Sequence, residues 1–142
     1  MKSKLLLSTF FLLFNTAALG AQQPPSDPLG ENLFPPELVM QHLQTLGLIE
    51  EKRVFLETEL RQAQTRFTEL QEELQGEAEK MIELVKVGRV NESQALAQLD
   101  KILNLEREIK RAQIALLIKI KNSLTPEQQM KLREIQNSLR GR

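Results

Sequence analysis

The sequence predicts an all-α protein with four helices, dominated by a long antiparallel helical hairpin that we expect to be bent and to form a dimer. Proline is absent between Pro36 and Pro126, and this interval is rich in the helix-favouring residues Leu, Glu, Gln, Lys, Arg and Ala. Apolar residues recur there at spacings of three and four, which keeps them on one face of a helix. Strand-forming residues are sparse and do not alternate with polar ones, so we expect no β-sheet.

The first twenty residues have the three parts of a secretory signal peptide. Lys2 and Lys4 form a basic start, residues 5–14 form an apolar run, and Ala18 and Gly20 are the small residues that a signal peptidase requires. The apolar run is shorter than the roughly 20 residues that span a bilayer, which argues against a membrane anchor. We therefore expect residues 1–20 to be cleaved, and the mature chain to reside in the periplasm without membrane insertion. It contains no cysteine for a disulfide or a lipid anchor.

Residues 21–36 form a proline-rich lead ahead of a helical domain at residues 37–140. The lead contains two proline pairs, at positions 24–25 and 35–36. Because proline fixes φ and lacks an N–H donor, we expect this lead to be disordered. A short helix should follow and end near Gly47, using four apolar residues: Leu38, Val39, Leu43 and Leu46.

The first long helix has an apolar stripe with regular steps of three and four. The stripe consists of Leu56, Leu60, Ala63, Phe67, Leu70, Leu74, Ala78, Met81 and Val85. Gly76 lies within this helix, where a glycine costs about 1 kcal/mol relative to alanine. Gly76 is either tolerated there or marks a bend, and we favour the bend.

A short loop around Gly88 should separate the two long helices. Gly88 suits the left-handed position that follows a helix, and Asn91, with Gln94 three residues later, can cap the next helix. The second long helix has its own apolar stripe: Ala95, Leu99, Ile102, Leu105, Ile109, Ala112 and Leu116. Two long helices joined by a short loop fold back on each other as an antiparallel hairpin.

The start of the last helix is the clearest local signal. In the segment Leu124-Thr125-Pro126-Glu127-Gln128, Thr125 suits the N-cap, Pro126 the first helical position and Gln128 the third. The Thr125 hydroxyl can accept from the backbone N–H of Gln128, while the Gln128 side chain reaches back to the cap. We expect the loss of the Thr125 side chain to destabilise the protein more than the loss of the Gln128 side chain.

This segment resembles the L-T-x-x-Q motif of the periplasmic Spy/CpxP family, which includes protein refolding chaperones and related heavy-metal sensors. The order of signal peptide, proline-rich lead, short helix, long hairpin and final motif is similar as well, so the resemblance covers essentially the whole mature chain. The family often has a first copy of the motif, and here residues 48–52 keep only its leucine. The resemblance implies a bent hairpin that dimerises into a cradle, whose concave face holds unfolding proteins.

No catalytic residue, metal ligand or cofactor is predicted, and we expect the protein not to be an enzyme. His42 is the sole histidine, so neither a metal site nor a His-dependent nucleophile has partners of the usual kinds. We expect it to be an exposed helix residue. The family's metal-sensing branch has a histidine pair on that helix and a His–Met pair before the final motif. The corresponding positions here are aliphatic: Leu38 or Leu46, then Leu116 and Ile120.

The segment 114–120 has apolar residues on more than one face of its helix, so it should be buried on more than one side. The last helix of the same chain is one possible cover, and a dimer partner or a bound client protein is another. A single hairpin buries only one layer of side chains, which favours dimerisation. The candidate client or dimer face consists of Ile114, Leu117, Ile118, Ile120, Lys110 and Arg111.

Two functions follow from these expectations. The first is an ATP-independent periplasmic chaperone or envelope-stress protein that binds partly unfolded proteins. The alternative is a periplasmic sensor or regulator of the heavy-metal-sensor type, acting on a membrane signalling partner. A purely structural coiled-coil adaptor is a third possibility, although the caps at Asn91 and Thr125 interrupt the long rod it would need. The 19 basic residues balance 19 acidic ones, so we expect no nucleic-acid partner.

Overall fold

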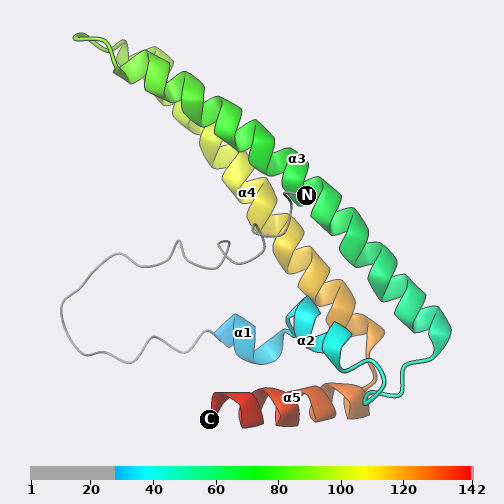
Figure 1. The fold of residues 1–142 in the computed structure, drawn as a ribbon. Coiled ribbons are helices and arrows are strands. Elements are labelled where there is room, and N and C mark those ends of the chain that lie inside the picture. Colours follow the sequence, from blue (N-terminus) through cyan, green and yellow to red (C-terminus); the bar gives the residue numbers. More distant parts are fainter. Residues whose placement is uncertain (1–27, 142) are drawn as a thin grey trace, which may run out of the picture.

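The computed structural model describes residues 28–141. In this part the protein contains helices and no strand: α1 (Pro28–Asn32), α2 (Pro36–Gln41), α3 (Glu50–Val85), α4 (Glu92–Ser123) and α5 (Pro126–Arg140). Figure 1 shows α3 and α4 side by side as an antiparallel hairpin. The predicted all-α hairpin fold is confirmed, and α1 is an additional short helix. No helix within residues 28–141 is long and apolar enough to cross a membrane.

The proline-rich lead is ordered from residue 28 onward, so the prediction of disorder over residues 21–36 is wrong for that part. Both α1 and α2 begin at a proline, a position where the missing N–H has no helical partner to lose. Between them, Phe34 has no exposed surface and belongs to the hydrophobic core. Prolines here start helices rather than prevent packing. The predicted signal peptide and residues 21–27 lie outside the described residues.

The short helix α2 ends at Gln41 instead of near Gly47. His42 follows it as the C-cap and is half-buried, so it is not the exposed helix residue that the sequence predicts. The chain continues in turns to Gly47, which has a left-handed φ of 62° that glycine adopts without steric cost. Leu46 nevertheless reaches the core, because a turn can point a side chain inward as well as a helix can.

Of the caps predicted for the two hairpin helices, the one at Asn91 forms and the one at Gly88 does not. α3 continues through Gly76 without a break, and Figure 1 shows a gradual curve rather than a kink at one residue. Gly88 does not have the left-handed conformation predicted for it; α3 ends instead with Lys86 in the right-handed region. The cap at Asn91 is confirmed, since its Oδ1 accepts from the Gln94 backbone N–H at 3.1 Å.

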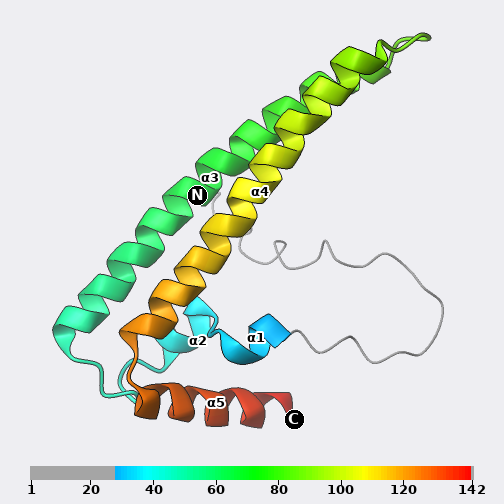
Figure 2. The ribbon, with the colours of Figure 1, turned by 180° about the vertical axis from the view of Figure 1, so that it is seen from behind.

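The hydrophobic core lies at one end of the hairpin, where α1, α2 and α5 gather (Figures 1 and 2). We call this end the base. Its buried residues are Phe34, Leu38, Val39, Leu46, Leu56, Leu116, Ile120, Leu124 and Leu132. We call the rest of the hairpin, residues 70–113, the arm. The arm consists of α3 and α4 alone. Its buried apolar side chains, such as Leu70 and Ile109, are isolated and do not form a cluster.

Candidate protein-binding surfaces

The capping box at the start of α5 has both of its predicted hydrogen bonds. The Thr125 hydroxyl accepts from the Gln128 backbone N–H at 3.2 Å, and Gln128 Oε1 accepts from the Thr125 backbone N–H at 2.9 Å. Pro126 occupies the first helical position and Leu124 is buried in the base. The Gln128 side chain also donates through Nε2 to the Leu46 carbonyl at 3.1 Å. Gln128 therefore ties α5 to the turns after α2.

Neighbouring groups stabilise the same turn between α4 and α5. Gln129 donates to the carbonyls of Lys121 and Leu124, at 3.1 and 3.3 Å, at the end of α4. The pKa of Glu127 lies below its ordinary value, because its carboxylate accepts a hydrogen bond from its own backbone N–H and another from the Thr125 hydroxyl. A carboxylate in the first turn of a helix is also favoured by the helix dipole. All these groups hold the turn in place.

The predicted client or dimer face is divided by the fold. Ile118 is 44% exposed and Lys110 and Arg111 are exposed, whereas Ile114 and Leu117 are half-buried. Ile120 is only 4% exposed and lies in the core of the base, so its assignment to a binding face is wrong. The chain's own helices cover this residue, as the alternative explanation of the apolar segment proposed.

One edge of the hairpin is polar and joined by contacts between its helices. Lys119 Nζ lies 2.6 Å from a Glu59 carboxylate oxygen, and Arg66 bridges to Glu108 at 3.1 Å. Nearer the tip, the buried Gln98 donates to the Glu77 backbone carbonyl at 2.8 Å and also to its carboxylate. These bonds fix the two helices along this edge.

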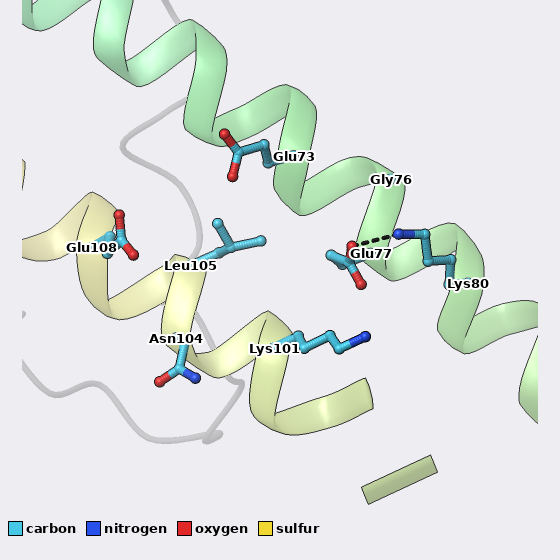
Figure 3. A pocket seen from close by; sticks show the side chains of 8 residues that line it. All are labelled: Glu73, Gly76, Glu77, Lys80, Lys101, Asn104, Leu105 and Glu108. Carbon is cyan, nitrogen blue, oxygen red and sulfur yellow. Dashed lines mark hydrogen bonds and ion pairs between the residues drawn. The ribbon is translucent and has the colours of Figure 1, made fainter. Parts of the chain in front are cut away.

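Figure 3 shows a shallow hollow on the polar edge, with α3 carboxylates facing α4 side chains. Its volume is about 480 Å³ and its residues are Glu73, Gly76, Glu77, Lys80, Lys101, Asn104, Leu105 and Glu108. The pKa of Glu77 is lowered because Lys80 and then Gln98 donate hydrogen bonds to its carboxylate. A carboxylate with a lowered pKa is ionised at neutral pH, whereas a general acid or base works best with a pKa near the operating pH. At the wall of this hollow, Glu77 forms an ion pair with Lys80 at 2.6 Å.

Two groups of exposed apolar side chains lie on the arm. The first, which we call the tip patch, surrounds the closed end of the hairpin and consists of Ile82, Val85, Val87 and Val90, which are 41–59% exposed. The second, which we call the α4 stripe, consists of Leu96, Leu99 and Leu103, which are 52%, 38% and 49% exposed. Their spacing of three and four places the stripe on one face of α4.

Sequence reasoning missed both groups. It assigned Val85 and Leu99 to the inward-facing stripes of their helices, and it gave no role to Leu96 and Leu103. The available signal was that α4 has more leucines than one inward face can hold. A helix with a second apolar face needs a second covering surface.

Among residues 28–141, no three His, Cys, Asp or Glu side chains gather in a way that could hold a metal ion. Comparison with protein-family models, with curated proteins and with solved structures found no match.

Proposed function

We propose that this protein is an exported, ATP-independent chaperone-like or envelope-stress protein that binds partly unfolded proteins in the periplasm. The observation that carries the proposal is the tip patch. Its four apolar side chains lie at the end of an arm, away from the core of the base. Contiguous exposed apolar residues mark interaction sites on soluble proteins, and partly unfolded proteins expose the apolar segments that fit them.

Charges of both signs surround the tip patch, which suits a surface that binds many sequences. Glu83 and Lys86 form an ion pair on α3, and Arg89 and Glu92 are exposed nearby. A rim of mixed charge repels neither acidic nor basic segments strongly, so it gives little discrimination between partners. Low selectivity is what a protein that holds diverse unfolded clients requires.

The sequence features agree with this proposal. A signal peptide would deliver the chain to the periplasm, where no ATP supply supports a nucleotide-driven chaperone. The resemblance to the Spy/CpxP family at Leu124, Thr125 and Gln128 implies the same kind of activity. The long hairpin with a capping box before its last helix is the architecture that this resemblance implies.

A client-aggregation assay tests the proposal. A chemically unfolded model protein is diluted with or without this chain, and its aggregation is followed by light scattering. The wild type should suppress aggregation, and the triple variant Ile82→Gln/Val85→Gln/Val87→Gln should lose most of that suppression. Glutamine is a good helix former, so α3 should persist in the variant, which circular dichroism verifies.

The control variant is Met130→Gln/Leu139→Gln, which changes two exposed apolar residues of α5 outside the tip patch. It should suppress aggregation as well as the wild type does. A folded tip variant with full activity would show that clients bind elsewhere. A wild-type chain without any effect on several clients would refute the chaperone proposal itself.

A further inference from the structure

Residues 28–48, which we call the strap, have little secondary structure of their own. They contain α1 and α2, which are five and six residues long, and a series of turns that ends at Gly47. Helices this short are unstable in isolation, so the order of the strap depends on its packing against the rest of the chain. That packing comes from four buried side chains of the strap in the core of the base: Phe34, Leu38, Val39 and Leu46.

The strap packs against apolar side chains of the other three helices, which we call the base surface. The buried members of the base surface are Leu56, Leu116, Ile120 and Leu132, and the partly buried Leu60, Phe67 and Ile135 pack against the same core. Peptide helices that dock onto other proteins use apolar anchors three or four residues apart. Phe34 and Leu38 of the strap have this spacing, so the strap occupies the base surface as a bound peptide would.

Three hydrogen bonds from side chains of α4 and α5 to backbone carbonyls complete the attachment of the strap. They run from Lys121 Nζ to the Asn32 carbonyl at 2.9 Å, from Gln128 Nε2 to the Leu46 carbonyl at 3.1 Å and from Lys131 Nζ to the Thr45 carbonyl at 3.1 Å. Every peptide segment carries backbone carbonyls, so these donors do not require the particular sequence of the strap. They can also bind the backbone of another segment that lies on the base surface.

The position of the strap in the chain allows it to detach without breaking up the hairpin. The strap joins α3 through residues 47–49, of which Gly47 and Ile49 are exposed. The helices α3, α4 and α5 follow one another after this junction, and Figure 2 shows the arm extending away from the strap. Segments with little structure of their own open locally at a lower free energy than the whole protein unfolds.

We propose that the base surface is a second protein-binding site, which the strap occupies in the closed state and an apolar segment of another protein occupies when the strap detaches. The strap itself defines the class of ligand: a segment with an aromatic residue followed, four and five positions later, by branched aliphatic residues, as in Phe34, Leu38 and Val39. Because the strap competes for the surface, only the fraction of chains with a detached strap binds the ligand. This site lies at the base, so it goes beyond the proposed function of the tip patch.

Binding of a fluorescent peptide with the sequence of residues 28–48 to the mature chain, followed by anisotropy, tests the proposal. Phe34→Ala in the chain weakens the strap but leaves the base surface intact, so this variant should bind the wild-type peptide at least about tenfold more tightly than the wild type does. Val39→Ala, a smaller change, should act in the same direction, and circular dichroism verifies that both variants are folded. Leu29→Ala is the matched control, because Leu29 belongs to the strap but is 58% exposed, and it should leave binding unchanged.

A crosslink that closes the strap gives the opposite test, because the chain has no cysteine of its own. Asn32→Cys/Lys121→Cys, joined by a short bis-maleimide, should lose peptide binding, while the same variant blocked with N-ethylmaleimide should keep it. Equal binding by the crosslinked and blocked forms would overturn the proposal, and so would folded Phe34→Ala and Val39→Ala variants that bind no more tightly than the wild type. The tip variant should bind the peptide normally, so this site and the proposed chaperone function can fail separately.

Discussion

Replacing Gln128 by alanine removes two hydrogen bonds that hold the last helix. One is the reciprocal bond of the capping box, from the Thr125 backbone N–H, and the other is donated to the Leu46 carbonyl. Each such bond contributes about 0.5–1.5 kcal/mol net, so Gln128→Ala should lower the free energy of unfolding by about 1–3 kcal/mol. Thr125→Ala should cost about 0.5–2 kcal/mol, the usual loss for a Thr N-cap. The tertiary bond thus raises the expected cost of Gln128→Ala to at least that of Thr125→Ala.

Urea denaturation followed by circular dichroism measures these differences at fixed protein concentration. Gln71→Ala on the exposed surface of α3 is the matched control and should change stability by less than about 0.5 kcal/mol. Gln128→Glu separates the two bonds, because a carboxylate can still accept from the Thr125 N–H but cannot donate to Leu46. It should lose about 1 kcal/mol. A Gln128→Glu variant as stable as the wild type would refute a stabilising role for the Leu46 contact.

Four further predictions concern the core, the hairpin and metals. Leu132 has no exposed surface, so Leu132→Ala should cost about 2–5 kcal/mol in urea melts, whereas Leu139→Ala, at a residue 56% exposed, should cost less than about 0.5 kcal/mol. A Cβ added at Gly76 would meet no atom within 4 Å, so Gly76→Ala should stabilise the protein by about 0.5–1 kcal/mol; a loss of stability would mean that the helix needs glycine there. The pKa of Glu77 in the folded protein lies below its ordinary value of 4.5. The ionised carboxylate therefore stabilises the fold above pH 4.5, and this stabilisation is lost as the pH falls through the folded-state pKa. The free energy of unfolding of Glu77→Gln, measured by acid melts, should depend less steeply on pH than that of the wild type. Isothermal titration calorimetry should detect no tight zinc or nickel site, and a stoichiometric site abolished by His42→Ala would favour the sensor function instead.

Local signals explain what the sequence predicts well. The caps at Asn91 and Thr125 form as expected, because each depends on a side chain and a backbone N–H three residues apart. The two long helices are also predicted correctly, because the spacing of their apolar residues is a pattern that repeats within a few residues. The predicted end of α2 near Gly47 fails because a six-residue helix has little stability of its own, and its boundary depends on how the base packs.

Surfaces were harder to predict because burial depends on elements that are distant in sequence. Ile118 and Ile120 are two residues apart and equally apolar, yet one is 44% exposed and the other 4%. Residues two apart on a helix point to nearly opposite faces, and the tertiary structure decides that the face of Ile120 is the one that joins the core of the base. The second function of Gln128 has the same origin, because Leu46 lies 82 residues away in the chain.

The sequence by itself determined that this protein is helical, that its second long helix starts after Asn91, and that a capping box begins the final helix, since these features arise from interactions within a few residues. The tertiary structure decided that the proline-rich lead contributes Phe34 to the core and that the core occupies only the base. It also decided that the apolar residues of the tip patch and the α4 stripe are left exposed on the arm. The physical reason is that hydrophobic burial is a property of surfaces brought together by folding, and one helix face cannot specify alone which surface will cover it.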